Sequence, residues 1–330
     1  ILYALRDLGE NPISFNIKQS SEDPDYIACK ELLENNPNMS LDCLEINFKE
    51  IWNIENFSRI SSLFNGFIHL PNAFYLDFLF SKASQKSKVI LSGEGSDEML
   101  RGYNRYENLP IIINNRYNEG YQSYRNFSNW PDEFNGLYEE VCLTNSFISR
   151  DIVLKTLREM GISSILNKRA AKLEKEIQKN YSHFKNLTVI QMMQISDIVF
   201  YLTAMLKRQD ILSMNNSIEC RVPLSSEIFS EINKELFNSN RFGKLQLKNI
   251  GKQLKLPKNI IERKKYGFPA SGMYFKKFLF SDLVKEKIES NQFTSEIYKV
   301  ANRILEKEED NQSGAKLDLM FSLASIAFNK

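Results

Sequence analysis

The chain has 330 residues, of which 42% are hydrophobic and 25% charged, proportions that are ordinary for a soluble globular protein. Its 43 Lys and Arg residues nearly balance its 41 Asp and Glu residues, which gives no reason to expect nucleic acid or an anionic membrane as a partner. Four scattered cysteines without a C-x-x-C pair, and only two histidines, argue against a zinc site and a disulfide scaffold and indicate reduced thiols in a cytoplasmic protein.

Apolar runs alternate with amphipathic stretches in the first third of the chain. Residues 1–8 predict the end of a helix, which residues 9–12 close with Gly and Pro. The predicted strands are 13–17, 42–48 and 88–91, and the predicted helices are 23–35, 50–64 and 74–83. This alternation predicts an α/β layer with a parallel sheet, in which residues 88–91 form a buried strand.

Strand signals fade after Tyr103, and helical periodicity follows over 187–214 and 232–256. We therefore predict two parts, an α/β part over residues 1–110 and a mainly helical part over residues 111–330.

The most informative stretch is the turn Gly93–Glu98, which follows the strand predicted at 88–91 and holds two glycines and three acids. Small residues at the carboxyl end of a parallel strand let a ligand approach the backbone. Carboxylate oxygens suit Mg²⁺, which completes its shell with water and phosphate oxygens. A helix start in which Ser96, Asp97 and Glu98 only cap the helix and favour its dipole fits equally well. The residues alone leave both interpretations open.

Three segments, in order, resemble signatures of the asparagine synthetase family. Gly93–Glu98 with Gly102-Tyr103 resembles the run G-[DE]-G-[AS]-D-E…G-Y. Arg208–Pro223 resembles D-R-x-S-M-x-x-x-x-E-x-R-x-P, and residues 256–268 resemble L-P…R-x-K-x-G-F. The resemblance spans nearly the whole chain. It implies a parallel sheet of the adenine-nucleotide α-hydrolase, Rossmann-like type, with a mainly helical C-terminal part that completes the active site.

The family resemblance implies an ATP- and Mg²⁺-dependent ligase, whose substrates are a small-molecule carboxylate and ammonia or an amine. The carboxylate is adenylated, the amine receives the acyl group, and AMP and pyrophosphate are released. By the same resemblance, Asp97 is a Mg²⁺ ligand, the backbone of Ser92 and Gly93 lies against the nucleotide, and Ile17 matches an adenine-contact position.

Two catalytic roles also follow from the resemblance. Glu94 is placed to deprotonate or orient the incoming amine. Lys265 matches the catalytic lysine, whose positive charge stabilises the pentavalent phosphate and the later oxyanion. Without the resemblance, Lys265 belongs to a basic run that is typical of a solvated face. Tyr103 and Tyr106 fit either a pocket lining or the core.

The middle motif favours an architectural role. Asp210, Glu219 and Arg221 are expected to be buried, and buried charges must be paired. We expect an internal ion-pair network that holds the helical part against the sheet.

The largest departure from the family is the absence of its S-G-G-x-D-S pyrophosphate loop. Ile1–Arg6 resembles the helix that should follow this loop, so we expect the first strand and the loop to lie upstream of Ile1. The N-terminal Cys of a glutaminase domain is also absent, which implies a separate glutaminase domain or N-terminal segment as partner. The sequence does not restrict the oligomeric state.

Smaller departures concern the substrate and the class of protein. Ile211, Ser225-Ser226 and Lys18 stand where the family has other residues, which leaves room for a relative similar to β-lactam synthetases or lasso-peptide cyclases. A catalytically inactive interaction module and a nucleotide-modifying relative with the same core are the competing hypotheses. The second usually needs catalytic cysteines or a basic RNA-binding face, and neither is evident.

Overall fold

The structure is a computed structural model that defines the placement of part of the chain. The described residues are 1–18, 20–34, 36, 38–68, 70–107, 156, 159–161, 175, 179–180, 189–226, 236–237, 239, 241–263, 273–307 and 313–329.

The described N-terminal elements mix helices with parallel strands, which agrees with the predicted α/β class. The first of them are α1 (Leu2–Asp7), β1 (Ile13–Lys18), α2 (Pro24–Glu34) and β2 (Ser40–Glu45). Strands β1 and β2 run parallel, with Ile13 opposite Ser40 and Lys18 opposite Glu45. The second predicted strand, 42–48, is confirmed with its boundaries shifted toward the N-terminus.

The prediction of a single helix over 50–64 is wrong, because the chain forms two helices there, α3 (Phe48–Ile51) and α4 (Ile54–Leu63). The break lies at Asn53, which has extended backbone and whose side chain accepts a hydrogen bond from the Asn56 N–H, so that it caps a new helix. Helix α5 (Ala73–Ala83), strand β3 (Val89–Leu91) and the one-turn helix α6 (Ser96–Met99) follow.

The described residues from 189 onward are mainly helical but include a strand. This strand, β4 (Glu219–Arg221), pairs in parallel with β3, placing Cys220 opposite Ile90. The predicted boundary near residue 110 lies outside the described residues. The elements of this part are α11 (Val189–Ser196), the π-helix η3 (Asp197–Leu202), α12 (Thr203–Asn215), β4 (Glu219–Arg221), the 3₁₀ helix η4 (Pro223–Ser225), α14 (Leu245–Gln253), α15 (Lys258–Ile261), α16 (Met273–Leu279), α17 (Asp282–Ser290), α18 (Gln292–Lys307) and α19 (Ser313–Ala327).

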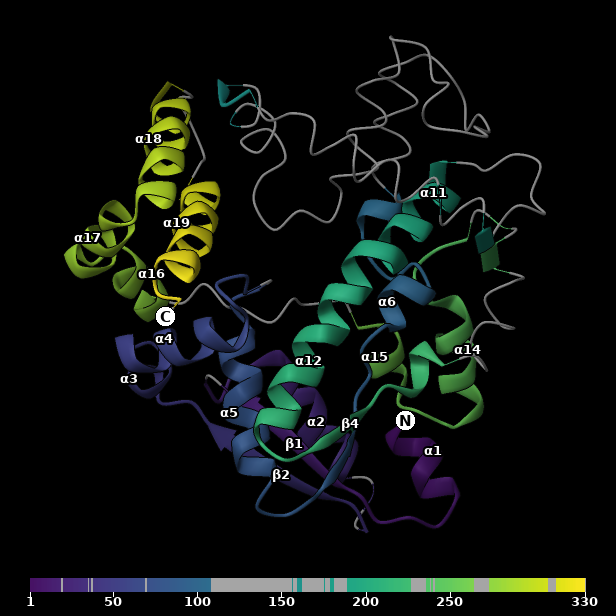
Figure 1. The fold of residues 1–330 in the computed structure, drawn as a ribbon. Helices are drawn as coiled ribbons and strands as arrows, with labels where there is room; N and C mark the ends of the chain where they lie inside the picture. The colour runs from purple at the N-terminus through teal and green to yellow at the C-terminus, as the bar shows by residue number, and fades with distance from the viewer. Residues whose placement is uncertain are drawn as a thin grey trace.

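An aromatic core joins the C-terminal helices to the α/β part. In Figure 1 the group α16–α19 lies beside α3 and α4. Trp52 packs against Phe74 and Phe275 with ring centroids 4.6 and 4.5 Å apart, and its indole N–H donates to the Tyr75 hydroxyl at 3.0 Å. Phe275 belongs to α16, so residues from both ends of the chain share one core. None of the described helices combines the length and apolar character needed to cross a membrane.

Candidate functional site

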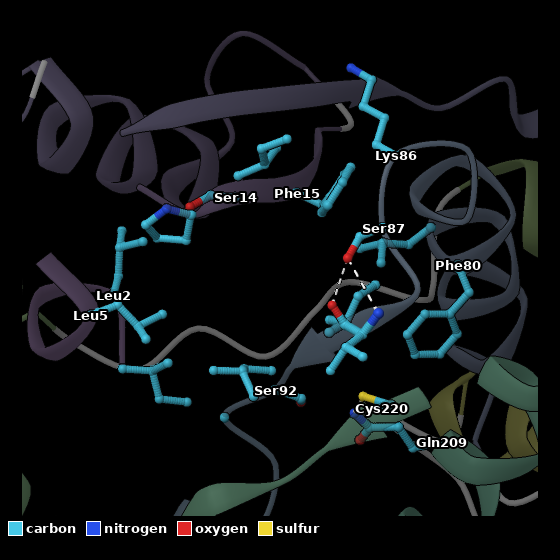
Figure 2. A pocket seen from close by; sticks show the side chains of 18 of the residues that line it. Leu2, Leu5, Ser14, Phe15, Phe80, Lys86, Ser87, Ser92, Gln209 and Cys220 are labelled. Atoms are coloured by element: carbon cyan, nitrogen blue, oxygen red, sulfur yellow. Dashed lines mark hydrogen bonds between the residues drawn. The ribbon is translucent and has the colours of Figure 1, made fainter. Parts of the chain in front are cut away.

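A cavity separates the two pairs of strands. Within the described residues β1 pairs only with β2 and β3 only with β4, and a cavity of about 640 Å³ is lined by residues of both β1 and β3. Figure 2 shows Leu2 and Leu5 of α1 at one end of it, Phe15 of β1 along one wall and Ser92 on the opposite side. The predicted burial of the third strand is therefore wrong: Val89 is 42% and Leu91 40% exposed, because they face this cavity instead of another strand.

The acidic turn follows β3 directly, at the edge of the cavity. Ser92 and Gly93 line the cavity, and Gly95 has a positive φ of 87°, a conformation that favours glycine. A side chain at Gly95 would also collide with the Ser225 hydroxyl. The Ser225 hydroxyl donates to the Glu94 carbonyl at 3.2 Å, so η4, which carries Ser225, stabilises the turn.

The Glu94 carboxylate lies against a buried arginine. The Arg208 guanidinium of α12 donates to Glu94 Oε1 at 3.1 Å and to Asn72 Oδ1 at 2.6 Å. The Arg208 side chain is only 2% exposed and that of Glu94 is 15% exposed. Burial lowers the pKa of Arg208, and the nearby Glu94 charge opposes this shift. The arginine therefore holds the Glu94 carboxylate in one orientation, next to the cavity-lining residues Ser92 and Gly93.

The Asp97 carboxylate faces a lysine from the helical part. Lys244 Nζ lies 3.0 Å from Asp97 Oδ1 and donates to Ser96 Oγ at 3.0 Å. The Asp97 side chain is 19% and that of Lys244 26% exposed, although the Oδ1 atom that faces the ammonium is itself buried. Both acidic candidates of the turn are thus paired with cations from distant parts of the sequence.

Glu98 belongs to a buried polar network beneath the turn. Burial raises the pKa of Glu98, and a hydrogen bond donated by the Tyr103 hydroxyl partly opposes that shift. Arg105 pairs with Asp197 of the π-helix at 2.7 Å and stacks over the Tyr103 ring. Tyr106, which is 1% exposed, also donates to Asp197 and belongs to the core.

The expected buried network of Asp210, Glu219 and Arg221 is wrong. All three residues are exposed, and Arg221 pairs locally with Glu219 at 2.8 Å. Their positions explain this, since Glu219 and Arg221 alternate with Cys220 on the short strand β4 and point away from the face that Cys220 packs. The buried cation of this segment is Arg208.

The other predicted site residues lie in different surroundings. Ile17 is 6% exposed and packs within the main hydrophobic cluster, whereas Ser14 and Phe15 of the same strand line the cavity. Lys265 lies outside the described residues.

Sequence reasoning missed Arg208 and Lys244 as partners of the turn. No local signal distinguishes Arg208, which stands in the polar run Lys207–Asp210, whereas Lys244 was marked by a Gly-Lys step before a helix.

These features define an α/β protein with parallel strands, a ligand-sized cavity between them and an acidic, glycine-containing turn at the carboxyl end of one strand. The model of the family described as asparagine synthase matches residues 38–327, and the chain therefore belongs to the asparagine synthetase family.

One curated relative is asparagine synthetase (glutamine-hydrolyzing) 1 of Bacillus subtilis (strain 168). It is 28% identical over 255 residues, which cover 69% of this chain and 38% of the relative. The chain thus spans well under half the length of that relative.

Proposed function

We propose that this protein is the synthetase part of an ATP-dependent amide-forming ligase. The observation that carries the proposal is the acidic turn at the carboxyl end of β3, bordering the cavity, in a chain that matches the family over residues 38–327. A small-molecule carboxylate would be activated as an acyl-adenylate, and ammonia or an amine would displace AMP.

The residues present fit a divalent cation at Asp97. A cationic group, the Lys244 ammonium, already lies 3.0 Å from one carboxylate oxygen, and both side chains are partly exposed. Within the described residues, no cluster of three or more His, Cys, Asp or Glu side chains could hold a metal by itself. This suits Mg²⁺, which is commonly bound by one or two carboxylates together with substrate phosphates. When bound, Mg²⁺ would neutralise charge on the phosphates of ATP.

The proposed reaction divides into two displacements. In the first, a carboxylate oxygen of the substrate attacks the α-phosphorus, and the bond to the β-phosphate oxygen breaks. In the second, the amine nitrogen attacks the acyl carbon, AMP leaves, and the nitrogen loses a proton. Glu94, held by Arg208, orients this amine or accepts its proton. Ser92 and Gly93 offer backbone to the nucleotide, and Lys265 supplies positive charge to the phosphate.

We propose that the parts work as a Rossmann-like sheet over residues 1–110, completed by an upstream strand, and a helical part over 111–330. The cavity between β1 and β3 supports this, because an extended segment placed there could hydrogen-bond to both strands. A pyrophosphate-binding loop would follow that strand. The curated relative is named glutamine-hydrolyzing, which supports a glutaminase domain or a separate N-terminal segment as the source of ammonia.

The test is nucleotide turnover across a panel of carboxylic acids and amines, with AMP and pyrophosphate both quantified. We expect the two products in equal amounts with at least one substrate pair, and their loss in Asp97→Asn. The assay should be run on the chain and on a longer product that includes upstream sequence. Failure of both proteins to release AMP or pyrophosphate across the whole panel would contradict the proposal.

A non-catalytic nucleotide-binding module is the second candidate. It is favoured by the internal pairing of both Glu94 and Asp97 with cationic side chains. Tight binding of Mg·ATP to the longer product without any turnover would support this alternative.

A further inference from the structure

The turn that carries Lys244 is joined by its backbone to the end of the acidic segment. The Gly243 N–H donates to the Arg101 carbonyl at 2.8 Å, and the Lys244 N–H donates to the Leu100 carbonyl at 3.2 Å. Gly243 has φ 83° and Lys244 has φ 57°, so both residues adopt left-handed backbone, which is uncommon for a lysine. The surrounding structure thus holds Lys244 in an unfavourable conformation that directs it toward Asp97.

A glycine makes room for the contact. A Cβ atom at Gly102 would collide both with the Asp97 carboxylate and with the Lys244 side-chain stem. The Gly-Tyr pair at 102–103 therefore has a physical role in this chain, since only glycine lets the ammonium reach the carboxylate.

We propose that Lys244 is the resident counter-ion of Asp97 and that it competes with the divalent cation for this carboxylate. The inference rests on the proposed metal site. The ammonium sits at one oxygen of the ligand that Mg²⁺ would take, and two positive charges at one carboxylate repel each other. Metal loading is then an exchange, in which the Lys244 side chain withdraws from Asp97. The partly exposed lysine side chain has solvent to move into.

The first experiment titrates the whole chain with Mn²⁺ alone, without nucleotide, and follows water-proton relaxation enhancement. Lys244→Met should bind Mn²⁺ about two- to five-fold more tightly than the unmodified protein, as expected when a partly exposed ion pair no longer competes. Lys248→Met is the matched control, because Lys248 is an exposed lysine four residues further along α14. It should leave the affinity unchanged, and adding Asp97→Asn to Lys244→Met should abolish the gain.

An unchanged or weakened Mn²⁺ affinity in Lys244→Met would overturn the proposal, as would equal gains in both lysine variants. Should Lys244→Met fail to fold, the unmodified protein provides a second readout. The acylation rate of Lys244 relative to Lys248, mapped by mass spectrometry, should rise when Mg²⁺ is added. A constant ratio contradicts the exchange.

These readouts are separate from ligase activity. Tighter Mn²⁺ binding without AMP release would retain the exchange and reject the proposed reaction. If the longer product releases AMP but Lys244→Met leaves the Mn²⁺ affinity unchanged, the proposed reaction is supported and the exchange is rejected.

Discussion

Arg208 and Glu94 form the least exposed ion pair at the candidate site. The Arg208 guanidinium is almost fully desolvated. The Glu94 carboxylate and the Asn72 amide oxygen offset the cost of burying its positive charge. Such a pair contributes orientation more than stability, because the cost of desolvation offsets much of the attraction. Glu94 consequently has a defined direction before any substrate arrives.

Replacing Arg208 by Met should lower the free energy of unfolding by about 3 kcal/mol, because Glu94 is left at the cavity edge without its partner. Urea denaturation measures this loss. Lys207→Met is the control, since Lys207 is exposed on the same helix and should change stability by less than about 0.5 kcal/mol. Equal stabilities of the two variants would show that the pair contributes no structural constraint.

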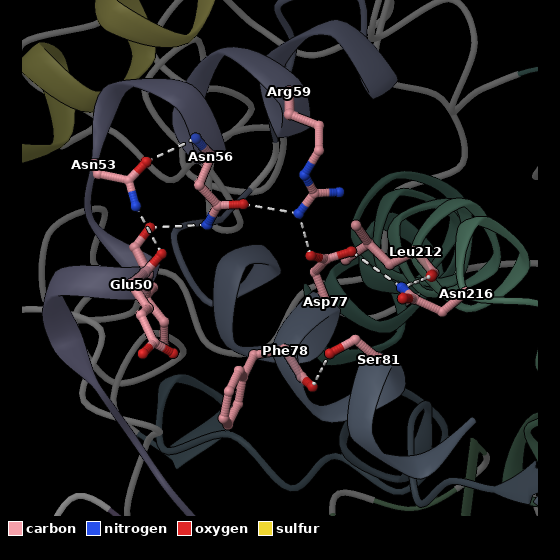
Figure 3. A network of polar contacts seen from close by, with 10 residues as sticks. Glu50, Asn53, Asn56, Arg59, Asp77, Phe78, Ser81, Leu212 and Asn216 are labelled. Carbon is pink, nitrogen blue, oxygen red and sulfur yellow. Dashed lines mark hydrogen bonds and ion pairs between the residues drawn. The ribbon is translucent and has the colours of Figure 1, made fainter. Parts of the chain in front are cut away.

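At the scale of elements, a polar network ties three helices together. Figure 3 shows Arg59 of α4 pointing toward Asp77 of α5, and Asn216 at the end of α12 donating to the same carboxylate. Arg59 also donates to Asn56 Oδ1 at 2.7 Å, and the Asn216 amide also bonds the Leu212 carbonyl at 2.8 Å. Asp77 thus links α12, which carries Arg208, to the helices of the α/β part.

Asp77→Ala should destabilise the protein by about 2–4 kcal/mol, because the 9% exposed carboxylate satisfies donors from two other helices. Chemical denaturation provides the value. Glu55→Ala serves as control, since Glu55 is exposed on α4 and we expect it to be nearly neutral. A change no larger than that of the control would mean that water replaces Asp77 without cost.

At the scale of the whole molecule, the described strands form two separate parallel pairs. Two parallel pairs of strands face a common cavity, and apolar side chains beside it remain partly exposed, with Ile13 at 45%, Val89 at 42% and Leu91 at 40%. Strands of parallel sheets are normally covered on both faces and have continuous apolar sequences, as Val89–Leu91 does. A further extended segment in the cavity would therefore bury apolar side chains that are now partly exposed.

A longer product with an apolar strand upstream of Ile1 should be more stable than the present chain, by about 1 kcal/mol for each of these three side chains that becomes buried. It should also lose binding of a hydrophobic fluorescent dye that the present chain retains. Calorimetry and dye titration check both results. Equal dye binding by the two proteins would mean that the segment does not enter the cavity.

The features that could be predicted from the sequence are those whose signals are local. The family motifs, the α/β alternation and the positions of β1, α2 and α5 could be predicted, because each depends on neighbouring residues and their periodicity. The boundary at Asn53 was missed although its signal is local, since a single capping side chain outweighed a continuous helical pattern.

Which charged side chains meet depends on tertiary packing and could not be predicted. Arg208 lies 114 positions from Glu94, and Lys244 lies 148 from Ser96, so no spacing rule relates them. Strand β4 was missed for a similar reason, because three residues carry little periodicity and become a strand only by pairing with β3. The motifs predict the acidic residues of the turn. Their partners are determined by packing between segments distant in the sequence, because a buried charge without a partner is energetically costly.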